Sequence, residues 1–223
     1  MLDLHFTTRL ADFQLDVDCT LPGEGVTAVL GPSGCGKTTL ASCIAGLRKP
    51  SRGYIAVNGR TFWSSEDKIA LPARKRGIGF VFQTHRLFPH MTVRDNLAFG
   101  NRVGARHTTA DPDELIDVLG IRRLLDRRPD TLSGGESQRV ALGRAILAAE
   151  TLLIMDEPLA SLDASRKEEL LGYFERIPTV ARIPILYITH SIHEAERLAD
   201  TIMTMASGTV TDIRTQQGAA SCI

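Results

Sequence analysis

One glycine-rich segment constrains the fold of this 223-residue chain more than any other stretch: Gly31-Pro32-Ser33-Gly34-Cys35-Gly36-Lys37-Thr38. It stands between an apolar run at 26–30 and a helix-like run at 39–47. Glycines permit backbone conformations that a Cβ would forbid, so successive N–H groups can turn toward one anion. The N-terminus of the following helix carries a partial positive charge at the same place. The pattern therefore predicts a phosphate-binding loop, not a glycine-rich turn that matches by chance.

The end of this loop carries the residue types that bind a nucleoside triphosphate. Lys37 is expected to reach the β- and γ-phosphates, and the Thr38 hydroxyl is expected to hold Mg²⁺. The predicted phosphate-binding residues are Gly31, Pro32, Ser33, Gly34, Cys35, Gly36, Lys37, Thr38 and Thr39.

Composition limits the partners but does not name them. The chain has 26 basic and 26 acidic residues, so no basic surface points to nucleic acid or to an anionic membrane. Its 43% hydrophobic residues are enough for a core, and no apolar stretch is long enough to span a bilayer. The cysteines form no CxxC pair, which favours reduced thiols in a cytosolic protein: Cys19, Cys35, Cys43 and Cys222.

Apolar runs alternate with helix-like segments along the chain, as in an α/β protein. The expected strands lie at 2–6, 13–21, 26–30, 54–57, 78–82, 151–155, 184–189, 202–206 and 209–213. The expected helices lie at 39–47, 92–98, 134–147, 164–177 (with Asp163 as N-cap) and 192–199, and another begins at residue 113. The strand at 54–57 indicates a small antiparallel layer beside the main sheet, and the polar stretch 61–76 is interpreted as a solvated connection.

Four continuous apolar runs predict a parallel sheet covered on both faces, and ligands of such sheets bind beyond the carboxyl ends of the strands. The run at 26–30 leads into the phosphate loop. The other three end at Gln83, at Asp156-Glu157 and at His190. We therefore expect these residues, which lie far apart in the sequence, to converge on one edge of the sheet.

Each of these strand-end residues suits one task in phosphate chemistry. Asp156 is expected to hold Mg²⁺ through water, and the alternative is a helix-cap or turn acid. Glu157 could orient and deprotonate an attacking water. Gln83 could contact the metal and that water. His190 could hydrogen-bond the γ-phosphate, with a purely structural histidine as the alternative.

Two further stretches are candidate binding sites, one for a phosphate and one for a partner protein. In Leu132-Ser133-Gly134-Gly135-Glu136-Ser137-Gln138, Ser133 and Glu136 form a capping box, and the two glycines leave the helix N-terminus open to a phosphate. An ordinary helix start is the alternative. The segment 87–91 is unusually apolar for a loop and is either a buried turn or a surface that docks a partner.

These motifs appear in the order found in ATP-binding cassette (ABC) transporter ATPases, which the chain resembles over nearly its whole length. The resemblance implies a P-loop NTPase core of the RecA-like type in a single domain, 1–223. It also implies a small antiparallel β layer and an inserted, mainly helical subdomain at about 84–150. ATP and Mg²⁺ are the implied cofactors.

The family resemblance also implies a head-to-tail dimer of two copies. In such a dimer the 133–135 segment and Gln138 of one subunit contact the ATP held by the phosphate loop of the other. Glu157 matches the catalytic carboxylate, His190 the switch histidine and Gln83 the Q-loop residue, while 161–163 matches the intersubunit D-loop.

The resemblance also places the chain at the cytoplasmic face of the inner membrane. Residues 87–91 match the region that docks the integral membrane permease subunits, and an extracytoplasmic solute-binding protein would act through those subunits. Neither Phe6 nor Phe13 stands clearly at the position of the aromatic residue that stacks on adenine in this family. No nucleic acid partner is expected.

Three stretches are similar, more narrowly, to molybdate importer ATPases: 86–90, 118–127 and 184–191. They predict uptake of molybdate or a related oxyanion. Such ATPases usually carry a C-terminal oxyanion-binding domain, and this chain ends at Ile223. The resemblance therefore does not imply regulation through that domain. The alternatives are an importer ATPase for sulfate, thiamine or polyamine, a soluble ABC protein acting on DNA or ribosomes, and a small-molecule kinase.

Overall fold

The computed structural model describes residues 1–10, 13–84, 86–103, 110–160 and 162–216. The chain divides into two compact units. The first, called here the phosphate-loop unit, comprises 1–76 and 184–223, and the second, called the helical unit, comprises 77–183. The helical subdomain expected at 84–150 falls within the second unit, and its own boundaries stay a prediction.

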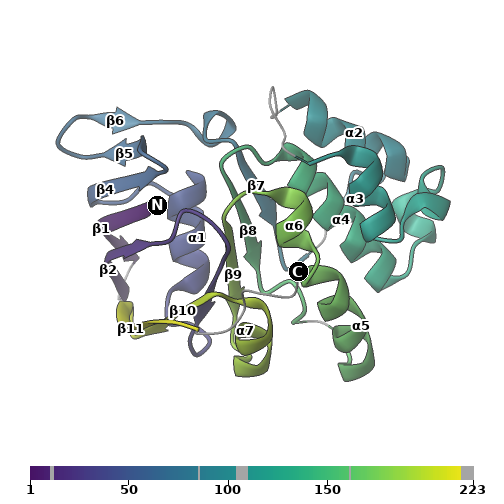
Figure 1. Ribbon diagram of the computed structural model, residues 1–223. Helices are drawn as coiled ribbons and strands as arrows, with labels where there is room; N and C mark the ends of the chain where they lie inside the picture. The colour runs from purple at the N-terminus through teal and green to yellow at the C-terminus, as the bar shows by residue number, and fades with distance from the viewer. Residues whose placement is uncertain (11–12, 85, 104–109, 161, 217–223) are drawn as a thin grey trace. The chain divides into compact units, whose positions relative to one another are not determined.

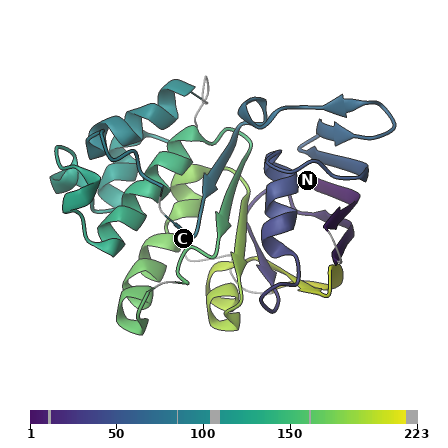
Figure 2. The same ribbon diagram turned by 180° about the vertical axis from the view of Figure 1, so that it is seen from behind.

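The phosphate-loop unit contains most of the strands. They are β1 (Leu2–Leu10), β2 (Phe13–Leu21), β3 (Val26–Leu30), β4 (Arg52–Val57), β5 (Arg60–Ser64), β6 (Ile69–Ala70), β9 (Ile185–Thr189), β10 (Thr201–Ala206) and β11 (Thr209–Thr215). The helices are α1 (Lys37–Ala45), the 3₁₀ turn η1 (Ala73–Lys75) and α7 (Ile192–Leu198). Figure 2 shows α1 lying beside the strands of this unit.

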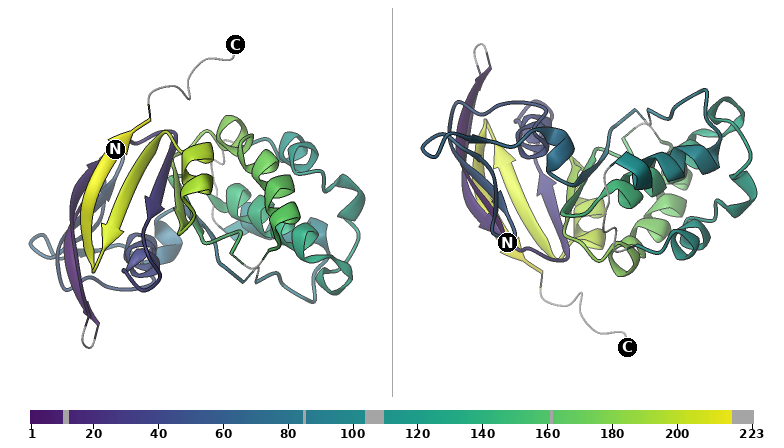
Figure 3. Two further views of the ribbon diagram at one scale, coloured as in Figure 1. Left: turned by 90° about the horizontal axis from the view of Figure 1, so that it is seen from below. Right: turned by 90° about the horizontal axis from the view of Figure 1, so that it is seen from above.

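The strands of this unit follow the order β6-β5-β4-β1-β2-β11-β10-β3-β9. The pairs from β6 to β2 are antiparallel, whereas β3 is parallel to both β10 and β9. The predicted antiparallel layer is therefore confirmed, and it continues into the parallel strands through the pairing of β2 with β11 (Figures 1 and 3). Phe6, Leu15 and Val17 of β1 and β2 are buried, as their alternating patterns predict.

The solvated connection predicted at 61–76 is wrong. This stretch contains the end of β5 and all of β6, and Phe62 and Trp63 are buried. Arg76, at the end of the basic run, is only 3% exposed. Its guanidinium donates to the carbonyl oxygens of Cys43 (2.9 Å) and Ile44 (2.6 Å) in the last turn of α1. A cation in this position adds donors to the carbonyls at the C-terminal end of the helix, where the backbone alone supplies few.

The helical unit contains β7 (Ile78–Val81), α2 (Val93–Val103), α3 (Pro112–Val118), η2 (Arg122–Leu124), η3 (Pro129–Thr131), α4 (Gly134–Ala148), β8 (Leu152–Asp156), α5 (Ala164–Phe174) and α6 (Ile177–Ala181). Strands β7 and β8 are parallel, and α4 packs against α2 and β7. Within the described ranges, no helix of either unit combines the length and the apolar character that crossing a membrane requires.

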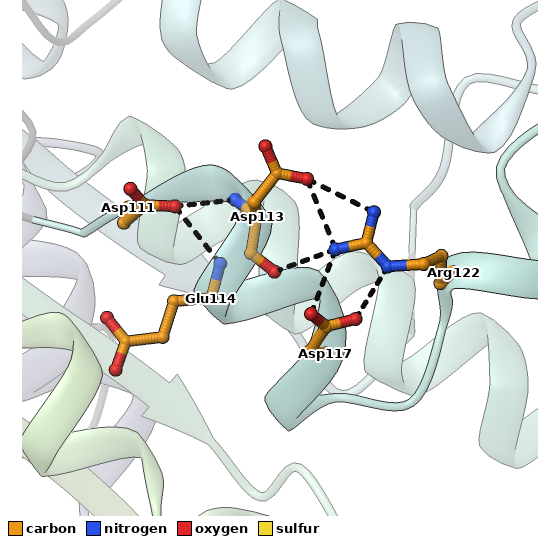
Figure 4. Close-up of polar contacts among 5 residues, drawn as sticks. All are labelled: Asp111, Asp113, Glu114, Asp117 and Arg122. Atoms are coloured by element: carbon orange, nitrogen blue, oxygen red, sulfur yellow. Dashed lines mark hydrogen bonds and ion pairs between the residues drawn. The ribbon is translucent and has the colours of Figure 1, made fainter.

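Local sequence explains where α3 begins (Figure 4). The carboxylate of Asp111 accepts hydrogen bonds from the backbone N–H groups of Asp113 and Glu114, so it is the N-cap. Arg122 then donates to the carboxylates of Asp113 and Asp117. The hydrogen bond from Arg122 is the largest cause that lowers the pKa of Asp117 below its ordinary value. The cluster holds the turn after α3 against the helix.

The predicted helix at 164–177 ends early. Asp163 is its N-cap as expected, and its side chain accepts from the Arg166 N–H at 3.1 Å. The helix stops at Phe174, and a separate short helix, α6, begins at Ile177. Pro178 lies in the first turn of α6, where its missing N–H costs nothing because first-turn N–H groups lack partners.

The described cysteines have free thiols, as expected, and all three are buried: Cys19, Cys35 and Cys43. Burial raises the pKa of Cys19 and of Cys43 to about 11. Cys222 lies outside the described residues.

Candidate functional site

The glycine-rich loop connects β3 to α1, as predicted. Gly34 and Gly36 have φ values of 81° and 109°, in the left-handed region that side chains rarely adopt. Gly36 is also the N-cap of α1. At Gly31 a Cβ would lie 2.4 Å from the carbonyl oxygen of Met205, so no side chain fits there. The middle of the loop is exposed at 32–34. Its shape is that of a cradle for an anion.

Lys37 places a positive charge inside this cradle. The residue is 4% exposed, and its Nζ donates to the carbonyl oxygens of Gly31 (2.8 Å) and Pro32 (3.0 Å). The ammonium group is therefore held by the two residues that open the loop. Thr38 follows it at the exposed start of α1. An ammonium, a helix N-terminus and a loop without side chains in its way together fit the phosphates of a nucleotide.

The structure separates the two aromatic candidates for stacking on a base. Phe6 is 2% exposed and belongs to the core. Phe13 is half-buried at the start of β2, and its ring lies 3.0 Å from the position that a Cβ of Gly36 would occupy. Phe13 therefore borders the phosphate loop, and Phe6 does not face solvent. Sequence periodicity alone could not distinguish them, because both residues follow alternating strand patterns.

His190 lies beside the phosphate loop at the same strand edge. In the parallel pair of β3 and β9, Leu30 is opposite Thr189. The next residues along the two strands are Gly31 and His190, and His190 is exposed. The predicted convergence of these two strand ends is therefore confirmed within the phosphate-loop unit.

Two other strand ends meet within the helical unit. Val81 of β7 is opposite Met155 of β8, which brings Gln83 to the same edge as Asp156 and Glu157. Asp156 is 7% exposed and Gln83 is exposed. Glu157 has a φ of 47°, an uncommon conformation for a residue with a side chain. Such strained residues concentrate at functional sites, which favours a chemical role for this carboxylate.

Ser133 and Glu136 form the predicted capping box at the start of α4. The Ser133 N–H donates to the Glu136 carboxylate at 2.9 Å, and the Glu136 N–H donates to Ser133 Oγ at 3.3 Å. The hydrogen bond from the Ser133 backbone is the largest cause that lowers the pKa of Glu136. A Cβ added at Gly134 or Gly135 would meet nothing within 4 Å. The N-terminus of α4 is therefore open, as expected.

Gln138, a predicted nucleotide-binding residue, points into the protein. It is 1% exposed, and its Nε2 donates to the carbonyl oxygen of Pro158. This bond ties α4 to the segment that directly follows Glu157. Its predicted contact with a nucleotide stays a prediction. Of the predicted D-loop, Ser161 lies outside the described residues, and Asp163 caps α5.

The apolar segment 87–91 is a turn fixed by two polar side chains, one buried and one half-buried, that sequence reasoning missed. Asn96 is fully buried; its Oδ1 accepts from the Phe88 N–H at 2.9 Å, and its Nδ2 donates to the Phe88 carbonyl at 3.2 Å. Arg144 of α4 donates to the Arg86 carbonyl at 2.8 Å, and its guanidinium lies 4.8 Å from the Phe88 ring centroid. Pro89 and the residue after it stay exposed at the tip.

The residues predicted to hold Mg²⁺ are Thr38 in the phosphate-loop unit and Gln83 and Asp156 in the helical unit. No group of three or more His, Cys, Asp or Glu side chains suited to a metal is found in the described part of the chain. Mg²⁺ characteristically binds through one or two protein oxygens together with water and phosphate oxygens. A hydroxyl at Thr38 and a carboxylate at Asp156 are donors of that kind.

Comparison with known proteins agrees with these features. A model of the ABC transporter family matches residues 15–160. Over 210 residues the chain is 50% identical to "Molybdenum import ATP-binding protein ModC" of Salmonella choleraesuis, and the match covers 94% of this chain and 59% of that protein. The chain therefore spans about three fifths of the length of this curated relative.

The fold of this chain closely resembles those of solved structures. The cbiO1 protein of Clostridium perfringens, part of the ABC transporter complex cbiONQ, has a TM-score of 0.79 and 26% identity, covering 96% of this chain and 88% of that one. The ATP-binding cassette MJ0796, in a dimeric post-hydrolysis state bound to ADP and Pi, has a TM-score of 0.77 and 23% identity, covering 98% and 100%. The predicted P-loop NTPase fold is confirmed.

Proposed function

The chain belongs to the ABC transporter family, and from that premise we propose that it is the ATP-hydrolysing subunit of an importer for molybdate or a related oxyanion. The observation that carries the proposal is the phosphate loop, with Lys37 enclosed by the Gly31 and Pro32 carbonyls, in a chain that also has an open helix N-terminus at Ser133. A phosphate loop and a capped helix N-terminus are each common in proteins, whereas their combination in one chain with the other motifs is typical of this family.

Binding of ATP is assigned to the phosphate-loop unit. The loop amides and the α1 N-terminus receive the phosphates, and the Lys37 ammonium exchanges its carbonyl partners for phosphate oxygens. Phe13 stacks on the adenine, because it is the aromatic residue that borders the loop. Thr38 and Asp156 are the residues that hold Mg²⁺, which supplies charge neutralisation at the phosphates when it is bound.

Hydrolysis is assigned to side chains at the strand ends. Glu157 accepts a proton from the attacking water, and its unusual backbone conformation sets the direction of the carboxylate. Gln83 orients that water, and His190 donates a hydrogen bond to the γ-phosphate. The transition state of phosphoryl transfer needs positioning and charge stabilisation more than covalent chemistry, which these residue types can supply.

A second copy of the chain completes the site in this proposal. Ser133, Gly134 and Gly135 of one copy cap the phosphates held by the other, so ATP closes a head-to-tail dimer and hydrolysis reopens it. Two observations support this: the open N-terminus of α4 and the similarity in fold to a cassette whose structure is dimeric. Within each copy, the hydrogen bond from Gln138 to the Pro158 carbonyl holds α4 to the segment after Glu157 and so stabilises the position of the Ser133 end.

The docking site for the membrane permease subunits is assigned to the turn at 87–91. Its exposed tip at Pro89 and His90 is held by hydrogen bonds from Asn96 and Arg144 to the backbone of the turn, which gives a permease subunit a fixed surface to dock on. Docking there places the chain on the cytoplasmic face of the membrane as a peripheral subunit, and an extracytoplasmic binding protein delivers the solute to the permease.

Molybdate is proposed because the relative at 50% identity is named as a molybdenum import protein. The test uses a strain that lacks this chain, grown on trace molybdate and complemented with wild type or Glu157→Gln. Cellular molybdenum should fall in the deletion strain and recover only with wild type. Normal molybdenum without the chain would reject the substrate assignment. ATP hydrolysis by the purified protein tests the enzyme assignment separately, and no phosphate release above a Glu157→Gln control would reject that.

A further inference from the structure

Glu194 is a buried carboxylate to which the proposed chemistry assigns no task. It lies on α7, four residues after His190, and is only 5% exposed. A buried carboxylate is costly unless hydrogen bonds compensate for lost hydration. Two hydroxyl groups donate to its Oε2 atom: Tyr187 at 3.0 Å and Thr189 at 2.7 Å. Both donors come from the last residues of β9.

The Thr189 hydroxyl links the Glu194 carboxylate to the backbone of Ser191, on the other side of His190. Its proton is donated to Glu194, so its lone pair is directed elsewhere and accepts from the Ser191 backbone N–H at 3.0 Å. In return, Ser191 Oγ accepts from the Glu194 N–H at 3.3 Å as the N-cap of α7. The two neighbours of His190 are therefore joined in one closed set of hydrogen bonds, which we call the Glu194 ring.

The position of His190 follows from this ring. The residue is exposed, so packing alone does not fix it, whereas Thr189 is 2% exposed and locked in the strand. Register places Thr189 opposite Leu30, directly before the phosphate loop. Fixing the backbone on both sides of His190 therefore fixes the point from which the imidazole reaches toward that loop.

We infer that Glu194 is a positioning residue for His190, acting through the Thr189 hydroxyl and the Ser191 amide. The inference rests on the proposed role of His190 at the γ-phosphate. Neither Glu194 nor Thr189 touches the nucleotide in this assignment. Loss of the ring should therefore lower kcat and leave ATP affinity unchanged, because the phosphate loop is built by β3 and α1.

The decisive variant is Thr189→Val, which removes the hydroxyl and keeps the shape of the side chain. Thr189→Ser is the conservative rescue. Tyr187→Phe is the matched control, because it removes the other donor to the same carboxylate and leaves the link to Ser191. The measurements are kcat for ATP hydrolysis, ATP affinity, and hydrogen exchange at the Ser191 amide. All variants are also made with His190→Ala.

Thr189→Val should lower kcat by about tenfold, a smaller effect than the roughly hundredfold cost of a 1 Å misplacement, and should speed exchange at Ser191. Thr189→Ser and Tyr187→Phe should stay within about twofold of wild type, as expected for variants that keep the ring closed. In the His190→Ala background Thr189→Val should have no further effect, because residues that act as a unit are not additive.

The outcomes separate the inference from the proposed function. If Thr189→Val keeps the wild-type kcat, or if its effect multiplies with that of His190→Ala, the inference is overturned while ATP hydrolysis stands. A loss of ATP affinity equal to the loss of kcat would show a general structural defect and overturn it as well. Absence of ATP hydrolysis in the wild type would instead reject the proposed function, and the inference with it.

Discussion

Leu30 and Thr189 face each other in the parallel pair of β3 and β9. Each is the last residue of its strand, so the chain leaves the two strands at the same edge, with Gly31 on one side and His190 on the other. A phosphate-binding loop and an exposed imidazole are thus neighbours through strand register alone. The same logic pairs Val81 with Met155 and brings Gln83 near Asp156 in the helical unit.

Lys37→Ala should weaken ATP binding by at least about tenfold, because a charge-assisted hydrogen bond contributes roughly 1.5–3 kcal/mol. The Nζ atom now bonds to two loop carbonyls, so it is already placed where the phosphates enter. Binding of a fluorescent ATP analogue measures the effect. Lys49→Ala, at an exposed lysine after α1, is the control and should bind as wild type. Equal affinity in both variants would contradict the role of the loop.

Glu157→Gln should abolish steady phosphate release while ATP still binds, since the amide keeps the shape but cannot accept the proton from water. The closed dimer should then accumulate, because reopening requires hydrolysis. Phosphate release and light scattering after size-exclusion chromatography measure the two effects. Near-normal turnover in this variant would show that Glu157 is not the base.

Phe13→Ala should raise the dissociation constant for ATP by about tenfold, because stacking of one base on an aromatic ring contributes roughly 1–3 kcal/mol. Phe13→Trp should bind at least as well as wild type. Inorganic triphosphate has no base and should bind both variants equally, which separates stacking from damage to the loop. A similar loss of triphosphate binding in Phe13→Ala would mean that the ring only supports Gly36.

Features carried by a few consecutive residues were predictable from the sequence. The phosphate loop, the capping box of Ser133 with Glu136 and the N-cap at Asp163 all form hydrogen bonds between residues no more than six positions apart. Continuous apolar runs likewise indicated the parallel strands and so the residues at their ends. These features depend on backbone geometry that local sequence determines.

Interactions between distant segments were not predictable. Arg76 bonds to carbonyls 32 and 33 residues earlier, and nothing in a basic run distinguishes this arginine from its exposed neighbour Arg74. The inward direction of Gln138 depends on Pro158, twenty residues later. A polar side chain is expected at the surface unless its buried partners are known, and single-sequence patterns do not contain them.

Asn96→Ala should loosen the turn at 87–91 and reduce docking to the membrane permease. The variant leaves the half-buried N–H of Phe88 without its acceptor, which costs about 1 kcal/mol. Arg94→Ala, at an exposed position on the same helix, is the control. Recovery of each variant with the permease in membrane fractions, and exchange at the Phe88 amide, measure the effect. Faster exchange with unchanged recovery would reject this turn as the docking site.

Arg76→Ala should lower the free energy of unfolding by about 3 kcal/mol, because it leaves buried carbonyls of α1 without charged donors. Burial lowers the pKa of Arg76 to about 10, so the guanidinium is still charged at neutral pH. Arg74→Ala removes an exposed cation from the same run and should change stability by less than about 0.5 kcal/mol.

Trp63 provides the measurement for this pair. It is the one tryptophan of the chain and is buried on β5, in the same unit as Arg76 and α1. Its fluorescence during urea unfolding therefore reports on the affected unit. Arg76→Lys should recover only part of the loss, because one ammonium cannot reproduce the planar fork that spans several carbonyls. Equal stability of the Arg76→Ala and Arg74→Ala variants would show that the capping of α1 by Arg76 contributes nothing.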